Sequence, residues 1–426
     1  MQTRSATQQA PIPLPPHHSG PRRLGPRPLP LHLMTALYAS LSLPTAWRSL
    51  NDASGNWNPP ASANLQKLQK LLADAERETG DTAALDSALR AEGLRHAHHF
   101  LTGVAHYQTS TVKRDLPDAP VVWQAGNTKL RDYAPGNKTA RPVLVIPSLI
   151  NRYHILDLDH GQSFLRFLAA QGLRPMLVDW DSPDEAEIRF TLDAYMAHRL
   201  LPALTHVIEV SGQTPHVMGY CMGGLLALAL AQLGGDAVQS LSLLATPWDF
   251  NQTGLTDILR NGSLTSIIND AGYMPVDMIQ SLFALQQPLQ VFKKFRDFGA
   301  RIAKPVDGYD NRRFVLVEDW LNDGVPLAAP VATQCLTDWY GRNTTKRGTW
   351  SVGGHVINPT AVKIPICVII PQQDRVVAPA AALPLAHAIP AAHLLQPDTG
   401  HIGMMASKRA ESILWRPFLS WIASLA

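Results

Sequence analysis

Two kinds of hydrophobic pattern follow each other along the chain. Between residues 64 and 105, leucines recur at helical spacing in two successive stretches, which predicts two helices. From about residue 141 to about residue 250, short apolar runs alternate with helical stretches. This alternation is typical of βαβ units in a parallel sheet, and strands that are apolar throughout indicate a sheet covered by helices on both faces.

The alternating pattern stops and later resumes. A mostly helical stretch rich in Leu, Phe and Trp interrupts it, and the strand–helix rhythm then returns with "PICVIIPQQD" and "AHLLQPDTGH". The start of the chain combines many prolines and arginines with no acidic residue, which predicts a disordered tail. We therefore predict a tail, a helical N-terminal region, a first part of an α/β core, a helical cap insertion and a second part of the core: 1–33, 34–135, 136–250, 251–354 and 355–426.

Composition and charge limit the partners and the compartment that we expect for this protein. The formal net charge of the 426 residues is +3, and Lys and Arg form no long block, so no nucleic-acid partner is expected. Three widely spaced cysteines, Cys221, Cys335 and Cys367, indicate neither a disulfide framework nor a zinc site and favour a reducing, cytoplasmic compartment. The apolar run 31–47 is short and contains Pro44, so we expect a docking helix, with contact to an apolar surface as the alternative, and no transmembrane segment or signal peptide.

One cysteine stands where a strand turns into a helix. "PHVMGYC" ends a strand candidate, and "MGGLLALALAQL" begins a helix that is apolar on nearly every side. Cys221 at this junction fits a nucleophile elbow, in which Gly219, Gly223 and Gly224 occupy the crowded positions. The helix N-terminus favours a thiolate there. A buried structural cysteine is the competing interpretation, and the strand–turn–helix context favours the nucleophile.

An acid and a histidine follow later strands in the order that such an elbow requires. Asp374 follows "PICVIIPQQ", and His401 follows "AHLLQPDTG". His401 would accept the thiol proton, and Asp374 would orient the imidazole or activate a second substrate. Asp249, after "LLATPW", and Asp398 are rival acids, because more than one strand end can supply the carboxylate.

The remaining chemistry is expected from the backbone rather than from a cofactor. An oxyanion hole would use the N–H of Met222 and a second N–H near Leu149 or Ile150 in "PSLINRYHILDL". The histidines of "RHAHHF", residues 95–100, are interpreted as an exposed polar face in preference to a metal site. No dinucleotide fingerprint or phosphate-binding loop is present in the sequence.

Together these motifs resemble those of polyhydroxyalkanoate (poly-3-hydroxybutyrate) synthases, within the α/β-hydrolase superfamily. "GYCMGG" is similar to the lipase-like box of that family with cysteine in place of serine, and "VLVIPSLINRYHILDL" is similar to P-P-x-I-N-x-x-Y-I-L-D-L. "QDRVVAP" and "GHIGMM" resemble its D-H-I-V-P and G-H-I-G motifs, with Arg375 where the family usually has histidine. The likeness runs in order from about residue 105 to about residue 405.

The resemblance implies an α/β-hydrolase fold with a helical cap, and an acyltransferase. Cys221, assisted by His401, would attack the thioester of an (R)-3-hydroxyacyl-coenzyme A, and Asp374 would help activate the 3-hydroxyl that extends the polyester. Coenzyme A is then part of the substrate, and no cofactor or metal is expected. The family also implies a homodimer or a partner subunit, and a place in the cytoplasm at a polymer granule. A hydrolase with the same three residues (a thioesterase or polyester depolymerase) and a non-catalytic granule-associated protein are the alternatives.

Overall fold

The protein forms two compact units. In the computed structural model the described residues are 23–46, 59–79, 82–253, 263–302 and 308–425. One unit, here called the helical unit, comprises Met1–Val112 and Leu289–Val315, and the other, the sheet unit, comprises Lys113–Pro288 and Leu316–Ala426. In the described part of the chain, no helix is both long and apolar enough to span a bilayer.

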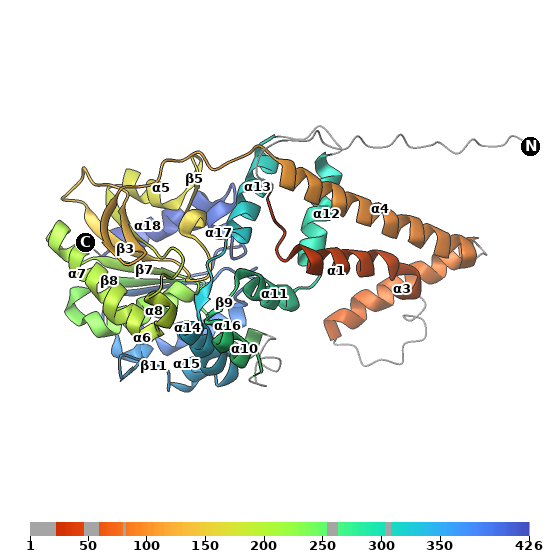
Figure 1. Cartoon of the computed structure of the whole chain (residues 1–426). Coiled ribbons are helices and arrows are strands. Elements are labelled where there is room, and N and C mark those ends of the chain that lie inside the picture. Colours follow the sequence, from red (N-terminus) through yellow and green to blue (C-terminus); the bar gives the residue numbers. More distant parts are fainter. Residues whose placement is uncertain (1–22, 47–58, 80–81, 254–262, 303–307, 426) are drawn as a thin grey trace, which may run out of the picture. The chain divides into compact units, whose positions relative to one another are not determined.

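The sheet unit is built on eight paired strands (Figure 1). In chain order they are β1 (Val121–Ala125), β2 (Thr128–Asp132), β3 (Arg141–Ile146), β6 (Leu173–Asp179), β7 (His216–Tyr220), β8 (Ser240–Leu244), β13 (Ile366–Ile369) and β14 (His393–Leu395). Their spatial order is β1-β2-β6-β3-β7-β8-β13-β14. The strands from β6 to β14 pair in parallel, whereas β2 is antiparallel to both β1 and β6. When only these eight strands are counted along the chain, their spatial order is 1-2-4-3-5-6-7-8. This order is that of the α/β-hydrolase fold, so the predicted fold class is confirmed.

Helices cover the sheet on both faces because its strands are apolar on both sides. On one face, α5 and α18 lie together (Figure 1), where the ring of Phe164 packs 5.6 Å from that of Phe418. On the other face, α8 contacts β3, β7 and β8, so its residues from Met222 to Ala231 are all buried. The helices of the sheet unit are α5 (Phe164–Ala170), α6 (Leu192–Tyr195), α7 (Leu201–Ser211), α8 (Met222–Gly234), α10 (Ser263–Ala271), α11 (Val276–Gln286), α14 (Ala329–Gln334), α15 (Thr344–Arg347), α16 (Pro379–Ala388), α17 (Gly403–Ala406) and α18 (Arg416–Ala423).

The helical unit is held together by a close crossing of two helices. Its helices are α1 (Leu29–Leu41), α3 (Pro59–Thr79), α4 (Thr82–Thr109) and α12 (Gln290–Ile302), and α13 (Gly308–Asn322) begins in it. The rings of Phe100 in α4 and Phe295 in α12 lie 6.3 Å apart. A Cβ atom at Gly103 would lie 2.1 Å from the Phe295 carbonyl oxygen, and one at Gly299 would lie 1.9 Å from the His99 carbonyl oxygen. Glycine is therefore needed on both helices for the backbones to approach.

The structure divides the chain differently from the predicted limits at two places. The predicted cap, 251–354, is not one insertion, because Leu289–Val315 belongs to the helical unit, where the phenylalanines of α12 pack against α4. The predicted helical region, 34–135, extends too far, because β1 and β2 lie within it. Leu130 of β2 pairs with Val178 of β6 and so joins the sheet.

The first described helix begins earlier than predicted. Residues 1–22 of the predicted tail, 1–33, lie outside the described residues, and α1 begins at Leu29. The prolines of this stretch do not prevent the helix, because Pro30 lies in its first turn, where the missing N–H has no partner in any case. The predicted docking helix is present, and it buries Ala36 in the helical unit.

Candidate active site

Cys221 stands at a strained turn between β7 and α8. Its backbone has φ +57° and ψ −125°, a conformation that favours glycine, and its N–H donates to the carbonyl oxygen of Leu244 at 2.8 Å. A non-glycine residue held there costs about 1–3 kcal/mol, and such strain is concentrated at functional sites. The turn places the Cys221 side chain at the N-terminus of α8, where it is partly exposed.

The three predicted elbow glycines are sterically required. A Cβ atom at Gly219 would lie 2.5 Å from the Gly223 carbonyl oxygen, and one at Gly223 would lie 2.2 Å from the Ile146 carbonyl oxygen at the end of β3. A Cβ atom at Gly224 would lie 1.8 Å from Thr246 Oγ1. The helix therefore starts in close contact with the ends of β3, β7 and β8, and this packing fixes where the sulfur points.

Replacing Gly224 with alanine should destabilise the sheet unit and displace Cys221. Overpacking of this kind typically lowers the free energy of unfolding by about 1–3 kcal/mol. In the described part of the chain the Thr246 hydroxyl has no hydrogen-bond partner, so adding Thr246→Ala should recover part of the loss. Chemical denaturation and acylation rates measure both effects. The matched control is Gly161→Ala, where an added Cβ meets nothing within 4 Å. An equal loss in the control, or no recovery in the double variant, would contradict the packing argument.

Asp374 and His401 form a buried pair at the same edge of the sheet. His401 Nδ1 lies 2.7 Å from Asp374 Oδ2, and the other oxygen, Asp374 Oδ1, accepts the N–H groups of Val376 and Val377 at 2.8 and 2.9 Å. Burial lowers the pKa of His401, but the charge of Asp374, then that of Cys221, and hydrogen bonds to both outweigh burial and raise it above its ordinary value. This arrangement favours an imidazolium beside the sulfur.

The two rival acids point elsewhere. Asp249 Oδ1 accepts the side-chain amide of Asn343 at 2.8 Å, and Asp398 Oδ1 accepts the side-chain amide of Gln373 at 2.6 Å. The structure therefore brings Cys221, His401 and Asp374 together and leaves Asp249 and Asp398 outside this group. The catalytic roles of the three residues stay predictions.

Tyr220 is a site residue that the sequence did not single out. Its hydroxyl donates to the backbone oxygen of His401 at 3.1 Å, and the two rings lie 5.1 Å apart. The residue before the nucleophile thus supports the loop that carries the histidine. The strand pattern of β7 marks Tyr220 only as buried, and its partner is 181 residues away, so the pattern could not have revealed this contact.

The candidate oxyanion hole lies where α8 meets the loop after β3. Met222 is the first residue of α8, so its N–H has no acceptor within the helix. Ile150 lines the same pocket as Met222 and Cys221, and its carbonyl oxygen accepts the Val325 N–H at 2.9 Å. Trp180 Nε1 donates to the carbonyl oxygen of Pro147, at the start of the loop after β3, at 3.0 Å. Met222 and Ile150 therefore line one pocket with Cys221, and their catalytic use stays a prediction.

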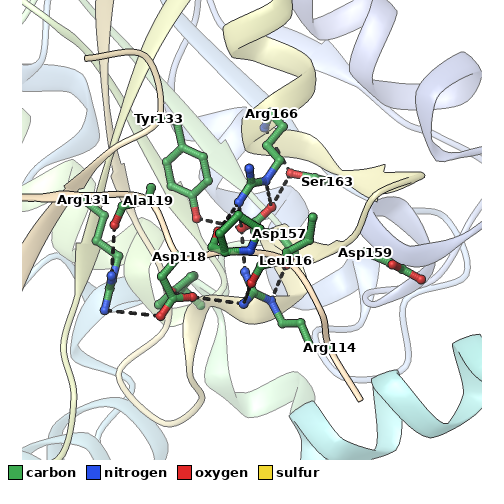
Figure 2. Close-up of polar contacts among 12 residues, drawn as sticks. Arg114, Leu116, Asp118, Ala119, Arg131, Tyr133, Asp157, Asp159, Ser163 and Arg166 are labelled. Atoms are coloured by element: carbon green, nitrogen blue, oxygen red, sulfur yellow. Dashed lines mark hydrogen bonds and ion pairs between the residues drawn. The ribbon is translucent and has the colours of Figure 1, made fainter. Parts of the chain in front are cut away.

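A buried carboxylate holds the far end of this loop. Asp157 begins β4 (Asp157–Asp159), which follows the short helix η1 (Tyr153–Leu156) and pairs with β5 (Gln162–Ser163). Figure 2 shows its four side-chain donors. Arg114 and Tyr133 donate to Oδ2 at 2.7 and 3.1 Å, and Ser163 and Arg166 donate to Oδ1 at 2.6 and 2.9 Å. This set satisfies a charge that would be costly to bury alone, and it ties the chain before β1 to α5.

An apolar pocket of about 850 Å³, including its opening, lies over the sulfur. Its lining combines the strand ends with helices of the predicted cap that belong to the sheet unit: Ile150, Cys221, Met222, Pro247, Phe250, Met274, Ile279, Leu282, Phe283, Leu327, Ala332, Cys335, Leu336, Trp339, Tyr340, Val376 and Val377. Cys335 and Cys367 are buried, and burial raises the pKa of both thiols. Arg375 follows Asp374 in the chain, and its side chain is exposed. Its backbone carbonyl oxygen accepts the side-chain amide of Gln287 at 2.8 Å.

The histidines of 95–100 form no candidate metal centre among the described residues, where no group of three metal-ligating side chains occurs. His96 Nε2 instead lies 2.9 Å from Glu92 Oε1.

Comparisons with known proteins connect this geometry to one family. Residues 95–168 match the family model described as "Poly-beta-hydroxybutyrate polymerase (PhaC) N-terminus". The poly(3-hydroxyalkanoate) polymerase subunit PhaC of Allochromatium vinosum is 26% identical over 374 residues, which cover 85% of this chain and 99% of that protein. The subunit of the same name from Haloferax mediterranei is 28% identical over 317 residues, which cover 71% of this chain and 63% of the relative, less than two thirds of its length. The chain is thus similar to poly(3-hydroxyalkanoate) polymerases over most of its length.

The residues matched by the family model include Ile150 and the buried Asp157. Among solved structures, an esterase from Thermogutta terrifontis aligns with a TM-score of 0.44 and 16% identity, covering 72% of this chain and 98% of the esterase.

Proposed function

We propose that the chain is an acyltransferase that polymerises (R)-3-hydroxyacyl-coenzyme A into polyhydroxyalkanoate through an acyl-enzyme on Cys221. The observation that carries this proposal is that Cys221, which lines an apolar pocket, lies beside the buried His401 and Asp374 pair, in a chain similar to polyhydroxyalkanoate polymerases. The relatives named above are called polymerases, which supports the same reaction here.

Acylation is the first proposed step. The Cys221 proton passes to His401 Nε2, and the sulfur attacks the thioester carbonyl carbon. The new S–C bond forms as the C–S bond to coenzyme A breaks, and the departing thiolate takes the proton from His401. In this proposal the N–H groups of Met222 and Ile150, two residues that line the same pocket as Cys221, stabilise the negative charge on the carbonyl oxygen between these events. One thioester replaces another, so the step is nearly balanced in energy.

Transfer to a hydroxyl is the second proposed step. His401 Nε2 takes the proton of a 3-hydroxyl group, whose oxygen attacks the acyl carbon on Cys221. A C–O bond forms, the S–C bond breaks, and the sulfur regains the proton, so the polyester grows by one ester. Asp374 holds Nδ1 of His401 protonated throughout, which keeps Nε2 available. These steps use only side chains, backbone groups and the substrate, and the proposal includes no cofactor or metal.

The apolar pocket favours transfer over hydrolysis. Its lining is carbon-rich, with Met274, Leu282 and Phe283 among its side chains, so it accepts an acyl chain and disfavours water. A hydroxyl carried by a bound acyl chain then meets the acyl-enzyme at high effective concentration. A thioesterase with the same three residues would need water to compete at this position.

We also propose that the enzyme works at the surface of its polymer in the cytoplasm. Helix α1 has no charged side chain and exposes large apolar side chains, among them Met34, Leu37, Tyr38 and Leu41. An insoluble polyester offers an apolar surface for such a face. The enzyme should therefore sediment with its product. Light scattering on the polymer-free enzyme tests the alternative occupants of this face, a second copy of the chain or a partner subunit.

The deciding experiment identifies the product. Purified protein is incubated with (R)-3-hydroxybutyryl-coenzyme A, release of the coenzyme A thiol is followed, and the acyl product is recovered, with Cys221→Ala as the control. Thiol release together with insoluble polyester, lost in the variant, is the expected result. Release of free 3-hydroxybutyrate would show a hydrolase instead. No release with acyl groups of several lengths would favour the non-catalytic alternative.

A further inference from the structure

The polar side chains of the pocket come largely from one segment. Residues Cys335–Gly341 form a π-helical turn, and this turn contributes Cys335, Trp339 and Tyr340 to the lining. Apart from Cys221, the other lining side chains are aliphatic, thioether, proline or phenylalanine groups. Turns of this kind are rare and are frequently found at functional sites. The question is which part of an otherwise apolar substrate such polar groups would meet.

Tyr340 lines the pocket that holds the reacting sulfur. Its ring packs edge-on against Phe250, with centroids 4.9 Å apart and an interplanar angle of 70°, so the ring is held in one orientation. Tyr340 lines the same pocket as Cys221 and Cys335. Burial raises the pKa of Tyr340, and the charges of Cys221 and then Cys335 raise it further. No described residue is hydrogen-bonded to this hydroxyl. It is thus a donor without a protein acceptor, in the pocket that holds Cys221.

A second donor in the same turn is also unused. Trp339 is 2% exposed, and its Nε1 has no hydrogen-bond partner among the described residues. A buried donor left without an acceptor typically costs about 1–3 kcal/mol. The π-helical turn thus carries two adjacent donors without a partner among the described residues, and each such group calls for an explanation, for which a ligand acceptor is a candidate at Tyr340.

We propose that the Tyr340 hydroxyl donates a hydrogen bond to the 3-oxygen of the acyl group at Cys221, and so selects 3-hydroxyacyl substrates. This inference rests on the proposed function. The acyl group has two acceptors close to the sulfur. In the proposed function the carbonyl oxygen is assigned to the N–H groups of Met222 and Ile150, which belong to α8 and to the loop after β3. The 3-oxygen is the acceptor that remains, and Tyr340 belongs to a different wall.

The selection follows from the chemistry of the pocket. Carbon-lined walls bind an acyl chain with or without a 3-hydroxyl, so they do not distinguish the two. A donor that needs an acceptor does distinguish them, because an acyl group without the 3-oxygen leaves that donor unpaired. Tyr340 is therefore a positioning and specificity residue, and it takes no proton in the reaction.

The test compares acylation of the full-length protein by (R)-3-hydroxybutyryl-coenzyme A and by butyryl-coenzyme A, which lacks the 3-oxygen. Single-turnover release of the coenzyme A thiol is measured for the wild type and for Tyr340→Phe, together with KM and kcat for the hydroxyacyl substrate. The wild type should favour the hydroxyacyl substrate by about tenfold, which is the ratio that one hydrogen bond between neutral groups supports. Tyr340→Phe should bring this ratio close to one by slowing the hydroxyacyl substrate alone.

A matched control separates this result from a general loss of structure. Tyr195→Phe removes a phenol hydroxyl from a separate, smaller pocket, which Trp180 also lines, and it should leave the ratio at the wild-type value. An equal slowing of both substrates by Tyr340→Phe, or an unchanged ratio, would overturn the inference while the proposed function stands. If the wild type forms an acyl-enzyme with neither substrate, the proposed function fails, and the inference fails with it.

Discussion

Replacing Cys221 with alanine should abolish polymer formation, lowering the rate of coenzyme A release by at least about 10⁴-fold. Alanine keeps the backbone of the elbow and removes the sulfur, so no covalent intermediate can form. His401 would retain its bond to Asp374, because that contact does not involve the sulfur. Mass spectrometry of the protein after brief exposure to substrate measures the acyl adduct directly. The wild type should gain the mass of one acyl group, or of an oligomer, and the variant should gain nothing.

The second thiol of the pocket provides the control for this prediction. Cys335 lines the same cavity as Cys221, but burial raises its pKa and no described histidine is bonded to it. Cys335→Ala should therefore keep the acyl adduct and lose at most about tenfold in rate, through altered packing of the pocket. If the adduct persists in Cys221→Ala and disappears in Cys335→Ala, the nucleophile has been assigned to the wrong thiol.

The order of the site along the chain could be predicted because it follows from the sheet. Apolar runs alternating with helices indicate parallel strands, and the carboxyl ends of parallel strands meet at one edge. Cys221, Asp374 and His401 each follow such a run, so their loops had to converge. The glycines beside Cys221 could also be interpreted from the sequence, because the tight turn itself leaves no room for their side chains.

The choice between Asp374 and Asp249 could not be made in this way. Both follow strands, and their difference lies in partners far away in the sequence. Asp249 is held by Asn343, 94 residues later, whereas Asp374 is fixed by the N–H groups of Val376 and Val377, which aim its second oxygen at His401. A pattern along the chain shows neither the distant amide nor the direction of an oxygen.

The limits of the predicted cap were wrong for a related reason. The described part of residues 251–354 is mostly helical, and a helical pattern does not show which neighbour a helix packs against. Helix α12 carries Phe292, Phe295 and Phe298 on a buried face that matches α4 in the helical unit. Its assignment depends on Gly103 and Gly299, which let the two backbones approach. That complementarity is a property of two distant segments together.

Replacing Asp374 with asparagine should lower the rate by about 10³- to 10⁴-fold while the fold is retained. One oxygen of Asp374 accepts two backbone N–H groups, so the amide oxygen of an asparagine would keep that position and its NH₂ group would face His401 Nδ1. Nδ1 would then have to be an acceptor, and the proton would move to Nε2. The nitrogen beside Cys221 could no longer take the thiol proton. Single-turnover acylation measures the loss, and Asp249→Asn, which alters the rival acid, should cost less than about tenfold.

The same substitution should change how stability depends on pH, and this separates the loss of charge from a general loss of packing. Because the pKa of His401 is raised in the native state, its protonation stabilises the fold. That contribution is fully present below the unfolded value, about 6.5, and is lost as pH rises through the higher native value. Asp374→Asn removes the carboxylate charge that helps to raise the pKa, so the difference in unfolding free energy between wild type and variant should shrink as pH rises. A difference that stays constant across this range would mean that Asp374 acts on His401 through shape alone, and that its charge does not hold the imidazolium beside Cys221.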